Sequence, residues 1–196
     1  MTLRYEKLTG EALKAVIPDL ARLRITVFRD WPYLYEGSED YETKYLARYS
    51  GTPGALVVGA YDGGRLVGAS TATPLAGEVD EFRAPFIEHG YDTGRVYYFG
   101  ESILLPEYRG RGAGHAFFDH REAQARALGG FAYTAFCAVV RDEDDPRKPP
   151  GHRPLDEFWR GRGYQPVLGM RARFSWRETG EAAESEKALQ FWLRPL

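Results

Sequence analysis

The stretch from Arg95 to Leu128 constrains the fold most, because a strand, a glycine-rich turn and a helix follow one another in it without interruption. Its first part, Val96–Leu105, is apolar, β-branched and aromatic, which predicts a strand. Pro106 and Glu107 end that strand. From Ala113 onward, apolar residues recur at helical spacing among good helix formers. We therefore expect the chain to be built around a strand–turn–helix unit.

The turn itself, Tyr108–Gly114, reads Y-R-G-R-G-A-G and predicts a phosphate site. The first turn of a helix leaves backbone N–H groups without partners, and the helix dipole adds partial positive charge there. Glycines have no β-carbon to hold a ligand away from those N–H groups, and arginines add fixed positive charge. The residues concerned are Gly110, Gly112, Gly114, Arg109 and Arg111. A phosphate or pyrophosphate is the expected ligand, and the alternative is a structural turn that binds no ligand.

Two common phosphate-binding patterns are excluded. A nucleoside-triphosphate P-loop needs a Lys-Ser or Lys-Thr pair, and the chain contains neither. A dinucleotide fingerprint starting at Gly110 would need a glycine where His115 stands. It would also need an acidic residue roughly 20 residues further on, where this chain is apolar.

Composition limits the class of protein. The 196 residues suffice for one sizeable core, and neither a repeat nor a linker divides them, so one domain over residues 1–196 is expected. A net charge of −2 gives no reason to expect nucleic acid or a membrane as partner. The single cysteine, Cys137, lies in an apolar run and is predicted to be a buried hydrophobic residue. Charged residues from Arg4 onward argue against a signal peptide, so a cytoplasmic protein is expected.

Hydrophobic periodicity predicts the element order β-α-α-β-β-β-α-β-α-β-β. Residues 76–94 are expected to form a loop with one helical turn at most, and the prolines of 141–154 predict an exposed loop. The strand after the central helix should run parallel to the central strand. The expected strands are 3–8, 55–61, 65–74, 96–105, 131–140, 167–177 and 187–193. The expected helices are 11–28, one from near residue 38, one from 113, and 155–162.

Arg109, Gly112 and Gly114 fit the pattern [R/Q]-x-x-G-x-[G/A], which resembles the pyrophosphate loop of the GNAT superfamily of N-acetyltransferases. The wider string L-L-P-E-Y-R-G-R-G-A-G-H-A-F-F is more specific than the glycines alone. F-W-R-G-R-G-Y, over Phe158–Tyr164, is similar to the family's second landmark, F-Y-x-x-x-G-F. Because the element order is also that of the family, the resemblance spans the chain. It implies an α/β (α+β) fold with a central mixed sheet, in which a splayed parallel strand pair is flanked by helices.

The resemblance also implies acetyl-CoA as cosubstrate, with no metal, and direct transfer of the acetyl group to a primary amine. His115 and His120 are five residues apart, which does not suit two ligands of one metal ion. A non-catalytic acyl-CoA-binding module is the alternative, and a nucleotide-dependent oxidoreductase has only the glycines in its favour. By resemblance, the pantetheine arm bonds to the backbone of Ile103, Leu104 and Leu105. The pyrophosphate then contacts Arg109, Gly110, Arg111, Gly112, Ala113 and Gly114.

Glu101 is the candidate general base, because it interrupts the apolar central strand just before the loop. Strict alternation would place it on one face with Phe99 and Ile103, where burial would raise its pKa. GNAT enzymes often hold a glutamate on this strand. The alternatives for Glu101 are a solvated face and a structural ion pair.

The proton donor for the leaving thiolate is the weak point of the resemblance. Many family members use the tyrosine of F-Y-x-x-x-G-F, but Trp159 occupies that position, and an indole N–H is not a proton acid near neutral pH. The family's asparagine after the second parallel strand is also absent. Tyr164 is the candidate replacement, with Tyr133, Tyr108 and solvent as alternatives.

The segment Asp30–Tyr45 mixes aromatic rings with carboxylates. Such a mixture suits a cationic amine, so we expect it to form a wall of the acceptor pocket; a solvated helix–turn–helix is the alternative. The acceptor would be a small-molecule or peptide amine. The strand at 187–193 is a candidate interface for a homodimer. The candidate substrate contacts are Trp31, Tyr33, Tyr35 and Glu36, and His152 lies in a loop that could close over the site.

Overall fold

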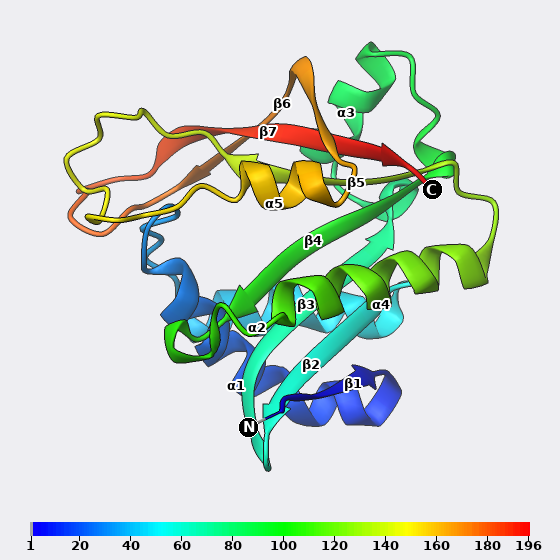
Figure 1. The fold of residues 1–196 in the computed structure, drawn as a ribbon, viewed down its shortest axis with the longest axis horizontal. Helices are drawn as coiled ribbons and strands as arrows, with labels where there is room; N and C mark the ends of the chain where they lie inside the picture. Colours follow the sequence, from blue (N-terminus) through cyan, green and yellow to red (C-terminus); the bar gives the residue numbers. More distant parts are fainter. Residues whose placement is uncertain (1) are drawn as a thin grey trace.

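The predicted hydrophobic runs form one seven-stranded mixed sheet in the computed structural model, which describes residues 2–196 (Figure 1). The expected mixed α/β architecture is therefore confirmed. The strands are β1 (Arg4–Leu8), β2 (Leu56–Asp62), β3 (Arg65–Pro74), β4 (Val96–Leu104), β5 (Tyr133–Val139), β6 (Gln165–Trp176) and β7 (Ser185–Pro195). They lie in the order β1-β2-β3-β4-β5-β7-β6. The α-helices are α1 (Gly10–Phe28), α2 (Glu39–Gly51), α3 (Asp80–Glu88), α4 (Ala113–Leu128) and α5 (Asp156–Gly161).

Local sequence signals explain most element boundaries. Ser38 caps α2, and its hydroxyl accepts the N–H of Tyr41 at 3.4 Å. The turn between β2 and β3 contains Gly63 at φ 59°, a conformation that glycine adopts without strain. Helix α1 continues through Pro18, because its buried stripe, which includes Leu13 and Leu20, packs on the sheet.

Helix α3 corrects the expectation of a loop over residues 76–94. It has nine residues and includes Pro85. Because proline disfavours a helix interior, the sequence favoured a loop here. Acidic residues Asp80 and Glu81 occupy its first turn, where they complement the helix dipole. Phe86 is fully buried and packs edge-on against Phe191 of β7 at 4.8 Å between ring centroids. Burial of that ring offsets the backbone bond lost at the proline.

The parallel pair β4–β5 splays after a short contact. Only three residue pairs join the strands, from Val96↔Tyr133 to Tyr98↔Ala135. In Figure 1 the two strands diverge toward the left of the view, where the N-terminal end of α4 also lies. Beyond Tyr98, β4 therefore has no strand partner on its β5 side.

A β-bulge in β4 lies just beyond that last pair. Ser70 of β3 faces Ser102 of β4, whereas Ala72 faces Phe99, so β4 has one extra residue between these pairs. Gly100 makes the bulge possible. A β-carbon there would lie 2.5 Å from the hydroxyl of Thr71 and 2.8 Å from that of Tyr49.

The bulge changes which face of the sheet each β4 side chain meets. Phe99 packs in a core with the α4 and α5 residues, whereas Ile103 packs in a core with α1 and α2. The expectation that Phe99 and Glu101 share a face is therefore wrong, because strict alternation fails where a residue is inserted. Glu101 and Ile103 both face α1 and α2.

Strand β7 is an interior strand and not a free edge. It pairs with β5 on one side and β6 on the other. Phe191 and Trp192, the aromatic residues that suggested a dimer interface, are buried within this chain. The proposed interface strand at 187–193 is therefore wrong. No helix among residues 2–196 combines the length and apolarity needed to cross a membrane.

Candidate active site

The glycine-rich turn opens α4 with two glycines at positive φ. The angle is 74° at Gly110 and 85° at Gly112, and a β-carbon added at either position would meet no atom within 4 Å. Gly112 is the N-cap of α4, and no side chain caps the first turn. The first-turn N–H groups therefore face an uncrowded surface, which suits an anionic ligand.

Arg109 and Arg111 are exposed beside these N–H groups. Arg109 donates from Nε to the carbonyl of Leu104 at 3.2 Å, which ties the loop to the end of β4. Arg111 donates to the carbonyl of Glu107 at 2.8 Å. Because both donate to neutral carbonyl groups in these contacts, their positive charge remains available to a phosphate.

Gly114 packs closely against α5. A β-carbon there would lie 3.2 Å from the ring of Phe158 on α5. The same ring packs edge-on against His115, with 4.9 Å between centroids. Gly114 thus lets α5 pack on the first turn of α4, and the structure gives His115 a packing role.

The predicted pantetheine contacts lie at the splayed end of β4. Ser102 is exposed although it lies on a central strand, because β5 has diverged there. Ile103 and Leu105 bury their side chains among α1 and α2 residues, so a ligand in the splay would meet backbone. The N–H of Leu105 donates to the carbonyl of Val67 at 3.0 Å and is therefore already used.

Glu101 belongs to a buried charge cluster on the α1–α2 face. Arg24 of α1 contacts Glu42 of α2 through Nε and Glu101 through Nη1. The side chains of Arg24, Glu42 and Glu101 are 9%, 0% and 8% exposed. Tyr45 donates its hydroxyl to Glu101 at 3.2 Å. Because two carboxylates share one guanidinium, the ionised cluster has a net charge of −1.

Two tyrosines of α2 adjoin this cluster as neutral donors. Burial, and then the charge of Glu101, raise the pKa of Tyr45 well above its usual value. The same causes raise the pKa of Tyr49 to about 12. The hydroxyl of Thr71 donates to Tyr49 at 3.1 Å and accepts the N–H of Glu101 at 3.1 Å. The bulge is thus held by the same hydrogen-bond network as the carboxylate.

Arg24 is a site residue that was not identified from the sequence. Leu13, Ile17, Leu20 and Arg24 follow one another at helical spacing and all are buried. A charged residue on the apolar stripe of a helix was the signal that could have found it. The same signal marks Arg121 on α4, which lies between Phe117 and Ala125 and is 2% exposed.

Two of the four predicted acceptor contacts lie near the Glu101 cluster. Burial is the main cause that raises the pKa of Tyr33 above its usual range, and the nearby Glu101 carboxylate adds to it. Burial and the charge of Glu42 raise the pKa of Tyr35. Both hydroxyls are therefore within electrostatic reach of the buried carboxylates.

The other two predicted acceptor contacts point elsewhere. The guanidinium of Arg141 lies over the ring of Trp31, 5.5 Å from the ring centroid. The ring centroids of Trp31 and His152 are 6.0 Å apart. Glu36 is exposed and pairs with Arg177 at 3.2 Å. The structure thus places Trp31 under the 141–154 loop and Glu36 on the surface, and neither is brought to Glu101.

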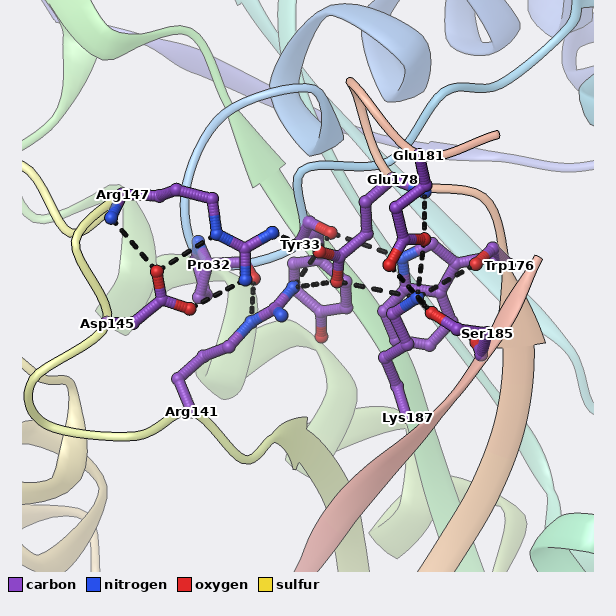
Figure 2. Close-up of polar contacts among 10 residues, drawn as sticks. All are labelled: Pro32, Tyr33, Arg141, Asp145, Arg147, Trp176, Glu178, Glu181, Ser185 and Lys187. Carbon is purple, nitrogen blue, oxygen red and sulfur yellow. Dashed lines mark hydrogen bonds and ion pairs between the residues drawn. The ribbon is translucent and has the colours of Figure 1, made fainter. Parts of the chain in front are cut away.

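A second buried charge cluster fixes the α1–α2 loop, as Figure 2 shows. Glu178, 1% exposed, contacts Arg141 at 2.6 Å, Arg147 at 2.5 Å and Lys187 at 3.7 Å. Arg141 also donates to the carbonyl of Tyr33 at 3.0 Å. The cluster therefore joins the α1–α2 loop, the β5–α5 loop and the β6–β7 connection beside Tyr33.

Tyr164 does not have the surroundings of a proton donor to a ligand. It is fully buried, and its hydroxyl lies 2.8 Å from the Thr134 hydroxyl and 3.3 Å from a Glu122 oxygen. Burial raises its pKa above the usual range. The sequence could not reveal this, because Tyr164 precedes β6 and its partners lie on β5 and α4. The structure thus gives Tyr164 a role in packing.

The other aromatic candidates also contact groups within the chain. Tyr108 donates its hydroxyl to Asp62 at 2.9 Å. Tyr133 packs edge-on against Tyr91, with 5.4 Å between centroids. Trp159 packs against the rings of Phe136 and Trp192, each 5.0 Å away.

Cys137 is a buried thiol, as predicted. Burial raises its pKa to about 12, so it is not a thiolate at neutral pH. The hydroxyl of Tyr98 lies 3.2 Å from its sulfur. Across the described residues, no group of three or more His, Cys, Asp or Glu side chains could hold a metal ion.

Comparison with known proteins gives one family. A sequence model described as the acetyltransferase (GNAT) family matches residues 20–147, which include the glycine turn, Glu101 and the C-terminal half of α1. No curated protein sequence has significant similarity to the chain.

Solved structures agree on the fold. An acetyltransferase from Thermus thermophilus has 16% identity and a TM-score of 0.58, with 100% of this chain and 98% of that chain covered. Arabidopsis thaliana NAA60 in complex with acetyl-CoA has 13% identity and a TM-score of 0.64, with 100% and 99% covered. A phosphinothricin acetyltransferase from Sinorhizobium meliloti, in complex with AcCoA, has 17% identity and a TM-score of 0.60, with 100% and 89% covered.

Proposed function

Because the chain belongs to the acetyltransferase (GNAT) family, we propose that it transfers an acetyl group from acetyl-CoA to a primary amine. The observation that carries this proposal is the position of Glu101. It lies on the bulge of β4, directly beyond the last β4–β5 pair and one loop before the glycine turn. A donor held by the turn and the splay would therefore present its reactive end beside this carboxylate.

The residues of the chain fit acetyl-CoA both at the glycine-rich turn and at the splayed end of β4. Gly110 and Gly112 leave the first-turn N–H groups open, and Arg109 and Arg111 bring two positive charges to a pyrophosphate. Ile103 and Leu104 offer backbone groups on the strand edge that β5 leaves free. Bound acetyl-CoA supplies the activated acyl carbon, and the protein supplies position, proton removal and charge stabilisation.

Glu101 is the proposed base. An ammonium with a pKa near 10 is not nucleophilic and must lose a proton on the enzyme. The Arg24–Glu42–Glu101 cluster has a net negative charge, so it attracts the ammonium form and can then take its proton. Tyr33 and Tyr35 supply aromatic surface near the carboxylates, which suits a cation. Both a small-molecule amine and the amino group of a peptide meet these requirements.

Steady-state kinetics with acetyl-CoA and a panel of amines tests the proposal. Matched alcohols in the panel separate N-acetylation from O-acetylation. We expect an amine to be acetylated, and we expect Glu101→Gln to lower kcat by about 100-fold or more near neutral pH. The loss should shrink at high pH, where free amine is available. Arg126→Gln, on the exposed face of α4, is the control and should leave kcat unchanged.

A non-catalytic acyl-CoA-binding module is the second candidate. Two observations favour it: Trp159 is packed between aromatic rings, and Glu101 is paired with Arg24. Calorimetric binding of acetyl-CoA, together with turnover of the amine panel, decides between the enzyme and the binding module. Tight binding of acetyl-CoA without turnover of any amine in the panel supports the binding module and contradicts the enzyme. A lack of binding by the wild-type protein contradicts both.

A further inference from the structure

Arg121 of α4 is a buried cation that the proposed reaction does not yet use. It is 2% exposed, and its Nη1 donates to the carbonyl of Glu101 at 3.2 Å. The guanidinium lies over the rings of Phe99 and Phe118, at 4.4 and 4.8 Å from their centroids. Within residues 2–196 no carboxylate lies at ion-pair distance from it, and its contacts are carbonyls and aromatic faces.

A buried charge without a counter-ion is costly, so its retention needs a reason. Burial lowers the pKa of Arg121 to about 10, and the side chain is still a cation at neutral pH. The charged and titratable groups facing it are Tyr97 and Glu101 of β4, Glu122 of α4, and Tyr164. Glu122 is already paired with Arg162 at 3.0 Å and Arg194 at 2.9 Å. The positive charge of Arg121 is therefore largely uncompensated.

The position of Arg121 connects it with the splay. The carbonyl that it binds, that of Glu101, lies beyond the last β4–β5 pair, where no neighbouring strand supplies a donor. Ser102, the next residue, is exposed on the α4 side of the sheet. Its cross-strand partner Ser70 is buried, and its hydroxyl has no hydrogen-bond partner. Arg121 thus lies where polar groups gather at the open end of the parallel pair.

We propose that Arg121 stabilises the thiolate of CoA as it leaves. The inference rests on the proposed function. The C–N bond forms at the acetyl carbon, the C–S bond breaks with its electron pair left on sulfur, and the proton from nitrogen goes to Glu101. The sulfur then needs a proton or a cation. Tyr164 and Tyr108 are engaged, and Trp159 cannot donate a proton, whereas Arg121 is a fixed cation bound to the backbone carbonyl of Glu101.

Calorimetry with CoA and desulfo-CoA, which lacks only the sulfur atom, tests this role. At pH 8.5 about half of a free thiol is ionised. We expect the wild-type protein to bind CoA about tenfold more tightly than desulfo-CoA, as a charge-assisted contact predicts. In Arg121→Met this preference should disappear, while the affinity for desulfo-CoA stays unchanged. Kinetically, kcat should fall with little change in the KM for acetyl-CoA.

Two further variants separate this role from folding. Arg121→Lys keeps the charge and should retain part of the preference for CoA. Arg126→Met removes a half-exposed arginine from the same helix and should behave as wild type. If Arg121→Met loses affinity for CoA and for desulfo-CoA equally, Arg121 has a structural role and the proposal is overturned.

The remaining outcomes are also decisive. If the wild-type protein binds both ligands equally, the thiolate role is wrong and the CoA site stands. If it binds neither, the proposed function fails and this inference fails with it.

Discussion

Gly112 shows how much one residue can contribute to a binding site. It has a φ of 85°, and no neighbouring atom would contact an added β-carbon, so its requirement for glycine comes from the backbone. Left-handed backbone costs other residues about 1–2 kcal/mol. A side chain there would also project from the surface that the first-turn N–H groups of α4 share.

Gly112→Ala should therefore weaken acetyl-CoA binding by at least about tenfold, because it both strains the N-cap and crowds the phosphate surface. Gly90→Ala is the matched control. Gly90 follows α3 at φ 78°, likewise with no neighbour within 4 Å of an added β-carbon. Both variants should lose similar thermal stability, and only Gly112→Ala should lose affinity in calorimetry. Equal affinities in the two variants would exclude the turn as the pyrophosphate site.

At the scale of elements, β4 separates what the sequence could predict from what it could not. The strand, the turn and α4 were predictable because local apolar spacing and glycines define them. The side of the sheet that each β4 side chain faces after Gly100 was not predictable, because the bulge depends on a contact with Thr71 of β3. The Arg24–Glu101 pair was equally out of reach, since its partners are 77 positions apart in the sequence (101 − 24) and meet only when α1 packs on the sheet.

Gly100→Ala should damage the bulge for a steric reason alone, since Gly100 has no positive φ. The new methyl group would press on the hydroxyls of Thr71 and Tyr49, and relief requires β4 to shift. Overpacking of this kind costs about 1–3 kcal/mol. Denaturant unfolding should show that loss, and kcat should fall more than KM rises because Glu101 moves. Gly64→Ala, in the open β2–β3 turn, is the control. Unchanged stability and turnover in Gly100→Ala would contradict this account of the bulge.

At the scale of the whole molecule, buried ion pairs hold several loops together, whereas the arginines of the glycine-rich turn are exposed. Glu178 of the β6–β7 connection contacts Arg141 and Arg147 of the β5–α5 loop and Lys187 of β7 (Figure 2). Arg141 also binds the carbonyl of Tyr33 in the α1–α2 loop. The prolines of the 141–154 segment predicted an exposed loop, which is correct for most of it. Its anchoring arginines could not be foreseen, because their carboxylate partner lies in the β6–β7 connection.

The contacts that hold these loops together should be sensitive to acid. Arg147 holds the pKa of Asp145 at about 2, below its ordinary 3.8. Backbone and side-chain donors hold the pKa of Glu181 at about 2, below its ordinary 4.5. Because the folded-state pKa values are depressed, their stabilisation is complete above about pH 5 and is lost as the pH falls toward about 2. The loops should therefore open between about pH 4 and pH 2.

Pepsin, which is active in acid, provides the measurement. Cleavage within 141–154 should begin below about pH 4, before far-ultraviolet circular dichroism reports global unfolding. Asp145→Asn removes one of the two titrating groups, so its loop should be cleaved at a higher pH than that of the wild-type chain. Asp119→Asn, which affects a carboxylate paired with Arg162 away from these loops, should not change the cleavage profile. Cleavage that coincides with global unfolding in every variant would mean that the loops have no separate acid-labile closure. Cleavage at a higher pH in Asp145→Asn alone would establish that these ion pairs hold the loops together.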